Sequence, residues 1–230
     1  MSSFWQFKRR APGLSAWHIF FWWGLMIWKL QFLLFVFYRI KYHGKENVPK
    51  SGSVLIVANH QSNLDPAIVG VLVYDRPFRG IAKEALFKSK LLSAYIRGFG
   101  AISIKRSESD TVAIRKSIAA LNSGRCVMMF PEGTRSSDGE VGEFQRGFWL
   151  IMKKSKATLL PVGIDGAFDV YPTGSKPKLF VRIEVTAGEA IDAEMLLNLG
   201  EEKGIAFVRN RIVELQQQCK SNILKRVSKN

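Results

Sequence analysis

Residues 54–66 read VLIVANHQSNLDP, and this stretch sets the expected fold class. Five apolar residues in succession, followed by polar ones, are typical of a short strand buried inside a sheet. Pro66 can occupy the first turn of a helix, because the N–H that it lacks would be unpaired there. A strand, a polar loop and a helix therefore follow one another, and α/β proteins place functional residues in such loops.

The same alternation of short apolar runs and helix-compatible segments continues along the chain. The expected strands are residues 79–82, 101–105, 126–130, 158–164 and 179–186, and the expected helices are residues 66–73, 89–97, 109–122, 144–155 and 201–218. Strands that alternate with helices predict an α/β fold built in layers.

Residues 1–43 differ from the rest and are predicted to form a membrane-associated helical segment, with residues 44–230 as the α/β domain. The segment contains five of the six Trp residues and six Lys or Arg residues, but no acid. Trp side chains favour the bilayer–water interface. Lys29 at mid-bilayer would cost about 2.5–3.5 kcal/mol, which favours helices lying in the interface over a spanning helix. A helix packed on the domain is a third possibility. A cleaved signal peptide is disfavoured, because no small-residue cleavage site follows the apolar block.

The net charge of +15, from 34 Lys and Arg against 19 Asp and Glu, calls for an anionic partner. Membrane and nucleic acid are the two candidates, and the sequence contains no helix-turn-helix, zinc or RNA-binding pattern. An anionic membrane is therefore expected, and nucleic acid is not. Two Cys and three His residues are too few for a disulfide framework or a Cys- or His-rich metal centre.

Two polar loops carry candidate chemistry. In the first, the carboxylate of Asp65 can accept one imidazole N–H of His60 and leave the other ring nitrogen as a base. A purely structural hydrogen bond is the alternative. The second loop, FPEGTRS at residues 130–136, also follows a buried run. Gly133 permits close approach of the backbone to a ligand, and Arg135 offers a planar group suited to phosphate. A turn whose Arg forms a surface salt bridge is the alternative.

Three further segments are weaker candidates. Residues 100–106, GAISIKR, form a strand that ends in two cations, and residues 83–88, KEALFK, are basic and apolar. Pro161 in the run 160–162 marks an edge strand or a strand end in the simplest interpretation.

Together, these motifs resemble the glycerophospholipid acyltransferases, and specifically the 1-acylglycerol-3-phosphate (lysophosphatidic acid) acyltransferase group. The family pattern N-H-x-S-x-x-D matches residues 59–65, G-x-I-x-I-x-R matches 100–106, and F-P-E-G-T-R-S matches 130–136. A fourth block with a central Pro matches loosely at 160–162, and the resemblance covers about residues 45–190. Lys105 departs from the family, which commonly has an acid or amide there. The resemblance implies a mixed central sheet flanked by helices.

The resemblance also implies a reaction, in which a fatty acyl group moves from acyl-CoA or acyl carrier protein to the free sn-2 hydroxyl of 1-acylglycerol-3-phosphate. The product is phosphatidic acid. His60 would be the general base and Asp65 its orienting partner. Phosphate-binding residues would be Arg106, Arg135 and Lys83, and the substrate pocket would include Glu132, Gly133, Thr134, Ser62 and Pro161. Ser62 is expected to be a hydrogen-bonding loop residue rather than an acyl carrier.

No metal or bound cofactor is expected, because the thioester is already activated. The expected partners are a lipid membrane, the acyl donor and the lysophospholipid. The expected location is the cytoplasmic face of a membrane, which would be the inner membrane in a bacterium.

Two alternatives stay open. The first is the same reaction on another acceptor, such as another lysophospholipid, dihydroxyacetone phosphate or an acylated amino acid. The second is a non-enzymatic basic membrane-binding protein, which explains the charge and the aromatic segment but not His60, Asp65 and the FPEGTRS loop together.

Overall fold

The computed structural model describes residues 11–83, 93, 96, 101–104, 110–170 and 178–228, which contain a seven-stranded sheet. Its strand order is β1-β7-β6-β2-β5-β3-β4. The β6–β7 pair is antiparallel and every other neighbouring pair is parallel, so the sheet is mixed as expected. The strands are β1 Lys41–His43, β2 Val54–Ala58, β3 Phe78–Lys83, β4 Ile102–Ile104, β5 Cys126–Met129, β6 Thr158–Asp165 and β7 Glu184–Ala187.

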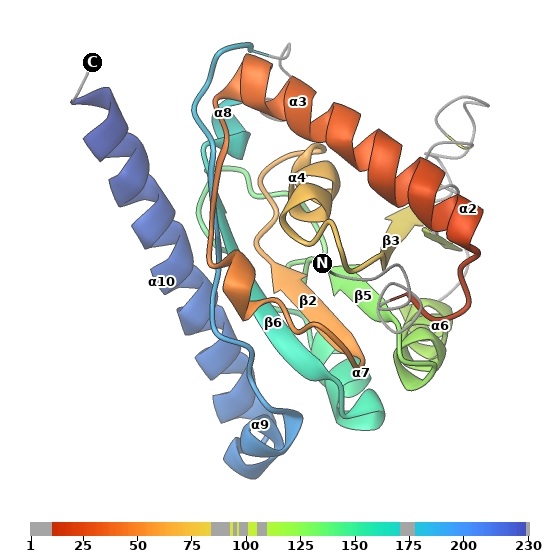
Figure 1. Ribbon diagram of the computed structural model, residues 1–230. Helices are drawn as coiled ribbons and strands as arrows, with labels where there is room; N and C mark the ends of the chain where they lie inside the picture. The colour runs from red at the N-terminus through yellow and green to blue at the C-terminus, as the bar shows by residue number, and fades with distance from the viewer. Residues whose placement is uncertain are drawn as a thin grey trace.

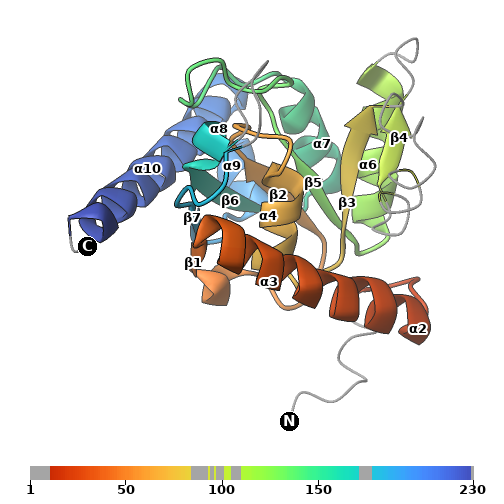
Figure 2. The ribbon, with the colours of Figure 1, turned by 90° about the horizontal axis from the view of Figure 1, so that it is seen from above.

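Helices cover both faces of the sheet (Figures 1 and 2). One face carries α3 and α4, and the other carries α6, α7, α9 and α10. The helices are α2 Ala16–His18, the π-helix η1 Ile19–Met26, α3 Ile27–Tyr38, the 3₁₀-helix η2 Lys45–Asn47, α4 Asp65–Leu72, α6 Asp110–Asn122, α7 Gly147–Ser155, α8 Ala167–Val170, α9 Ala193–Leu199 and α10 Glu201–Val227.

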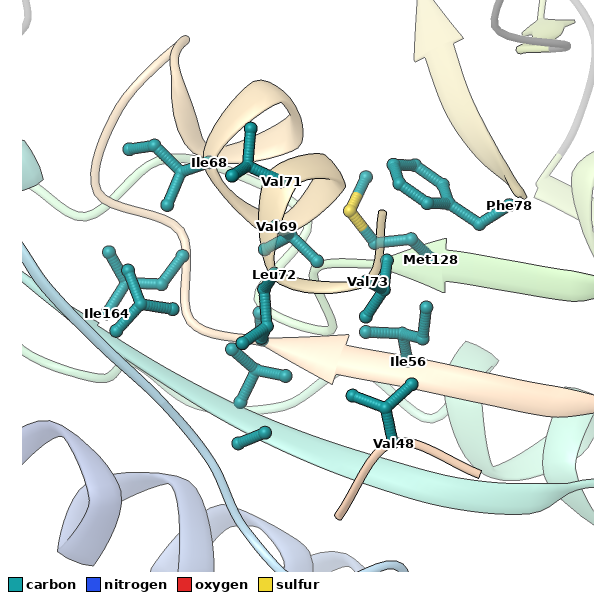
Figure 3. Close-up of a cluster of buried hydrophobic side chains, with 14 of the residues drawn as sticks. Val48, Ile56, Ile68, Val69, Val71, Leu72, Val73, Phe78, Met128 and Ile164 are labelled. Atoms are coloured by element: carbon teal, nitrogen blue, oxygen red, sulfur yellow. The ribbon is translucent and has the colours of Figure 1, made fainter. Parts of the chain in front are cut away.

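The apolar run of β2 is explained by these two layers. Val54, Ile56 and Ala58 pack in the cluster beneath α4, whereas Leu55 and Val57 pack in the cluster beneath α7 and α10. Figure 3 shows Ile56 and Met128 among side chains of α4. A strand that is covered on both faces needs apolar residues at every position, which is why the run shows no alternation.

β7 is shorter than the strand predicted for residues 179–186. It begins at Glu184, because the preceding residues pair with the end of α3 instead of with a strand. The Phe180 N–H donates to the Phe37 carbonyl at 2.7 Å, and the Ile183 N–H donates to the Tyr38 carbonyl at 3.3 Å. The residues before Glu184 therefore form a loop that runs alongside the C-terminal end of α3, although their alternating apolar pattern resembles that of a strand.

Pro161 does not mark an edge or a strand end, since β6 lies between β2 and β7. The Pro161 carbonyl accepts the Gly188 N–H at 2.9 Å, just beyond the end of β7. The N and C=O of one strand residue face the same neighbour. An N–H at position 161 would donate to the Gly188 carbonyl, so the proline gives up one bond, at the end of the β6–β7 ladder just beyond the last residue of β7.

The boundary predicted between residues 43 and 44 falls inside the folded unit. Lys41, Tyr42 and His43 form β1 and pair in parallel with Glu184, Val185 and Thr186 of β7. The sheet therefore begins within the segment that the sequence assigned to the membrane.

The N-terminal helix has one buried side and one exposed side. Trp23, Ile27 and Leu34 belong to the core cluster on the α4 side of the sheet. The side chains of Trp28, Phe32 and others point away from it, and the large exposed apolar residues here are Trp17, Phe20, Phe21, Leu25, Trp28, Phe32, Leu33, Phe35 and Val36. Residues Ile19–Tyr38 are long and apolar enough to cross a membrane by length and composition, with a mean hydropathy of 1.7. The helix thus packs on the domain and still presents an apolar face outward.

Candidate active site

The candidate residues follow strands that run in the same direction. β2, β5, β3 and β4 are consecutive parallel strands, so their carboxyl ends meet at one edge of the sheet. His60 follows β2, Arg135 follows β5, and Lys83 is the last residue of β3. Arg106 follows β4 in the sequence but lies outside the described residues, as does the side chain of Lys83.

His60 and Asp65 form a direct contact at this edge. The His60 Nδ1 atom lies 2.8 Å from the Asp65 Oδ2 atom. The same carboxylate oxygen accepts the backbone N–H groups of Gln61 and Ser62, each at 2.7 Å. Asp65 is fully buried, whereas the His60 side chain is 19% exposed. The carboxylate therefore orients the ring with Nδ1 as a donor, and Nε2 is left as the nitrogen that can accept a proton.

Burial raises the pKa of Asp65, and hydrogen bonds from His60 and from the backbone of Ser62 and Gln61 counteract part of that rise. These donors favour the ionised form, which is the form that can hold an imidazole N–H. The short polar loop before α4 thus supplies N–H donors that favour the ionised form of the Asp65 carboxyl.

The second loop holds His60 from the other side. The Phe130 ring stacks on the His60 ring, with centroids 4.1 Å apart and planes inclined by 12°. Glu132 Oε1 accepts the His60 N–H at 2.8 Å, and the Ser136 N–H donates to the His60 carbonyl at 2.7 Å. Both backbone groups and the ring of His60 are therefore fixed by the FPEGTRS segment.

Glu132, expected in the substrate pocket, is mainly a connection between loops. Its Oε1 accepts the His60 N–H, and its Oε2 accepts the Gly142 N–H at 3.1 Å. Burial raises the pKa of this carboxyl, and these two N–H donors counteract part of the rise. Glu132 thereby fixes the backbone of the catalytic candidate His60 to residues beyond the motif.

A polar cavity of about 260 Å³ lies next to this loop and contains Arg135 and Thr134 from the predicted set. It is lined by Glu132, Thr134, Arg135, Ser136, Ser137, Asp138, Glu140, Val141, Gly142 and Glu143. Arg135 is the one cation of this lining, beside four acids, so a bound phosphate would be held at the Arg135 end. Gly133, with φ of 73°, makes the turn that precedes Thr134.

Two other predicted pocket residues have structural contacts. The Ser62 hydroxyl accepts the Leu64 N–H at 3.3 Å and is buried, in agreement with a loop hydrogen-bonding role. Pro161 is buried inside β6, before the carboxyl edge where His60 lies.

Sequence reasoning missed several residues that support the site. Asn59 connects the loop to β6, because its side chain both donates to and accepts from the backbone of Ile164, at 2.9 and 2.8 Å. The Gln61 and Gln216 side chains each donate to the Gly139 carbonyl at 2.6 Å. Asn59 could have been found as the first letter of its motif. Gln216 could not, because it comes from α10, which contains no motif.

Among the described residues, no group of three or more His, Cys, Asp or Glu side chains is arranged to hold a metal ion. The described groups at this edge include an oriented imidazole, its buried carboxylate partner and the guanidinium of Arg135.

Comparison with known proteins gives a consistent result. A family model described as Acyltransferase matches residues 39–165. A 1-acyl-sn-glycerol-3-phosphate acyltransferase of Bacillus subtilis is 26% identical over 185 residues, covering 78% of this chain and 89% of that protein. The chloroplastic enzyme LPAT1 of Arabidopsis thaliana is 32% identical over 146 residues, covering 62% of this chain and 40% of that protein. The chain thus spans less than half of the length of the plant relatives it matches.

A solved structure is also similar. The crystal structure of the 1-acyl-sn-glycerophosphate (LPA) acyltransferase PlsC from Thermotoga maritima superposes with a TM-score of 0.73 at 26% sequence identity. The match covers 86% of this chain and 81% of that one.

Proposed function

Because this chain belongs to the acyltransferase family, we propose that it transfers a fatty acyl group to the sn-2 hydroxyl of 1-acylglycerol-3-phosphate. The observation that carries the proposal is the contact of His60 Nδ1 with the buried carboxylate of Asp65, with Nε2 free to act. The acyl donor is a thioester of coenzyme A or of acyl carrier protein. No metal or bound cofactor is needed, because a thioester carbonyl is already activated for attack.

The reaction follows from the orientation of the ring. His60 Nε2 takes the proton of the acceptor hydroxyl while that oxygen attacks the thioester carbonyl carbon. A C–O bond forms, the C–S bond breaks, and the imidazolium returns its proton to the leaving thiolate. Asp65 stabilises the imidazolium while it exists, and Phe130 keeps the ring in the same plane. General-base assistance of this kind contributes about 10²–10⁴ in rate.

Acceptor recognition is assigned to cations at the same edge of the sheet. Arg135 lines the polar cavity beside the His60 loop, Lys83 is the last residue of β3, and Arg106 follows β4 in the sequence. A phosphate held by charge-assisted hydrogen bonds would bring the sn-2 hydroxyl of the acceptor toward His60.

The membrane is the proposed partner, and the cytoplasmic face is the proposed location. The exposed apolar side of η1 and α3 supports association with a bilayer, and the buried side chains Trp23, Ile27 and Leu34 hold the helix along the domain. A helix held in this way would lie in the interface, where the lysolipid can enter the site from the bilayer.

The test is thiol release from acyl-CoA and from acyl carrier protein by detergent-solubilised protein, with and without 1-acylglycerol-3-phosphate. Release that depends on the lysolipid, with phosphatidic acid as product, is the expected result. Release only with a different acceptor from a panel of lysophospholipids, dihydroxyacetone phosphate and acylated amino acids would replace the proposed acceptor. No release with any of them from folded protein would favour a non-enzymatic membrane binder.

Arg135→Ala tests the phosphate assignment. Loss of a hydrogen bond to a charged group costs about 1.5–3 kcal/mol, so kcat/KM for the acceptor should fall about tenfold to a hundredfold, mainly through KM. Arg146→Ala is the control, because Arg146 is 81% exposed in its side chain and pairs with Glu201 on the surface. Unchanged KM and kcat in Arg135→Ala would contradict the assignment.

A further inference from the structure

We propose that the loop Lys178-Leu179-Phe180 is a second membrane-inserting element, which places its two apolar side chains among the acyl chains of an anionic bilayer. Leu179 is 52% exposed and Phe180 is 63% exposed, although both are large and apolar. The inference rests on the proposed membrane association of α3, but not on the proposed acyl transfer.

The loop is fixed to the end of the helix that carries the exposed apolar face (Figure 1). The Phe180 N–H donates to the Phe37 carbonyl at 2.7 Å, and the two rings lie 6.4 Å apart between centroids. The next connection is the Ile183 N–H to the Tyr38 carbonyl. Because Phe35 and Val36 are exposed on the last turns of α3, the loop continues the apolar face of that helix.

The backbone conformation of Phe180 is unusual for an aromatic residue. Its φ of 64° lies in the left-handed region, which a residue with a Cβ adopts only against a steric penalty that glycine avoids. The ring lies beside Phe37 but is largely exposed, so packing within the domain offsets only part of that penalty. Strained residues persist where their conformation serves a function, and here it directs an aromatic ring outward.

Charge selects an anionic bilayer as the partner. Lys178 is exposed beside the two apolar residues, and Arg39 and Lys41 are exposed on the strand and helix end to which the loop is hydrogen-bonded. Apolar side chains ringed by cations match the interfacial region of a membrane with acidic lipids, where each basic residue near the surface strengthens binding.

Site-specific labelling tests the insertion directly. Both native cysteines, Cys126 and Cys219, are buried, so Phe180→Cys introduces an exposed thiol that a nitrobenzoxadiazole dye can label selectively. The labelled protein is mixed with vesicles of phosphatidylcholine and phosphatidylglycerol, without any enzyme substrate. The expected result is a blue shift and quenching by lipids that carry a nitroxide on the acyl chain. The control is Met195→Cys on α9, which is 42% exposed on the other side of the sheet and should show neither change.

Phe180→Gly separates insertion from folding. Glycine accepts the left-handed conformation, so the thermal unfolding midpoint should be unchanged or higher, whereas the partition coefficient onto the same vesicles should fall about tenfold or more. If Phe180→Gly partitions onto vesicles as strongly as the wild type, insertion of this loop is contradicted. The same holds if the dye at position 180 stays exposed to water on vesicle-bound protein. Either result would leave the proposed membrane association of α3 intact. Failure of the wild-type protein to bind these vesicles would overturn the inference together with the membrane association. Neither measurement depends on acyl transfer.

Discussion

His60 and His43 each contact a carboxylate, but the two pairs have different surroundings. The His43 Nε2 atom lies 2.6 Å from Glu184 Oε2, and the other oxygen of Glu184 accepts a hydrogen bond from Arg226 of α10 at 2.6 Å. That pair connects β1, β7 and α10. The His60 ring keeps Nε2 free at the carboxyl edge of the sheet, beside the cavity that contains Arg135. The short His–carboxylate distance is therefore common to both pairs, and the free Nε2 atom and the position at the carboxyl edge of the sheet distinguish His60 as the candidate base.

His60→Ala tests this distinction. Turnover should fall about 10²–10⁴-fold, because the proposed general base is lost. The far-ultraviolet circular dichroism should stay close to that of the wild type, whereas the unfolding midpoint should fall somewhat, because the buried Asp65 carboxylate loses the imidazole N–H.

The matched control is His43→Ala, which should lower the unfolding midpoint while turnover stays within a few-fold of the wild type. Normal turnover in His60→Ala would rule out the proposed mechanism.

At the scale of elements, a carbonyl group joins three parts of the chain. The Gly139 carbonyl accepts from Gln61 of the His60 loop and from Gln216 of α10, and both amides also approach Asp165 at the end of β6. The C-terminal helix is thus connected to the loop that carries His60, although the two are far apart in sequence.

Asp165 predicts an unusual pH dependence of stability. Burial raises its pKa, and the hydrogen bonds from Gln61 and Gln216 only partly counteract that effect. Its contribution to the free energy of unfolding is therefore fully present below the unfolded-state pKa and is lost as pH rises through the folded-state pKa. Each unit by which the folded-state and unfolded-state pKa values differ corresponds to about 1.4 kcal/mol in the free energy of unfolding. Asp165→Asn should gain stability relative to the wild type between about pH 4 and pH 7 in urea unfolding.

Asp138→Asn is the control with the opposite sign. Asp138 is exposed, and hydrogen bonds from the Glu140 N–H and the Ser136 hydroxyl lower its pKa. Its contribution is present at neutral pH and lost on acidification, so the stability that Asp138→Asn loses relative to the wild type should develop mostly below about pH 4, as pH rises toward the ordinary carboxyl pKa. A stability difference for Asp165→Asn that does not vary with pH would contradict the first prediction.

The packing of α10 on β6 gives a second test at this scale. A Cβ added at Gly163 would lie 2.6 Å from the backbone of Leu215 and Gln216, so the helix packs directly against the strand backbone. Gly163→Ala should lower the free energy of unfolding by about 1–3 kcal/mol, because rigid backbone must shift. The measurement is urea unfolding at neutral pH.

Gly80→Ala in β3 is the comparison for that substitution. Its Cβ would meet the flexible end of Met128 at 3.4 Å, so little or no loss of stability is expected. Equal stability of Gly163→Ala and the wild type would show that the helix does not pack on the strand in this way.

At the scale of the whole molecule, the two faces of the sheet have different outer layers. The face with α3 and α4 carries the exposed aromatic side of the N-terminal helix, while the other face carries α6, α7, α9 and α10 (Figure 2). The N-terminal helix contacts the core on one side and exposes an apolar surface on the other, which explains why apolar residues occur around most of its circumference. The layer that covers this face of the sheet therefore also carries the apolar surface on which the proposed membrane association rests.

Replacing Trp28, Phe32 and Phe35 by Ser should release the protein from anionic vesicles. Burying one large apolar side chain is worth about 1.5–3 kcal/mol, so the three together should lower the partition coefficient by more than about a hundredfold. Co-sedimentation with vesicles measures this. The unfolding midpoint in detergent should change little, since these side chains are largely exposed.

The matched control replaces three exposed apolar residues of the opposite layer, Leu150, Met195 and Phe207, by Ser. These changes should leave vesicle binding unaltered. Similar losses of binding in the two triple variants would indicate that the apolar surface is not specific to the N-terminal helix.

The sequence by itself determined the features that depend on neighbouring residues. The strand at Val54–Ala58 was predicted with its observed bounds, because five consecutive apolar residues are stable only between two covered faces. The spacing of His60 and Asp65 was also readable, since both lie in one short loop at the start of α4. The order of the motifs identified the family, which the comparisons confirm.

Only the tertiary structure decided which distant segments meet. The pairing of Lys41–His43 with β7, the late start of β7, the central position of Pro161 and the contact of Gln216 with Gly139 were all missed or wrongly predicted. Glu132, predicted to shape the substrate pocket, lines the polar cavity and also holds the backbone of His60, a contact that the sequence did not reveal. The physical reason is that periodicity reports which side of an element is covered, whereas the partner that covers it is chosen by packing and hydrogen bonding between residues far apart in the chain.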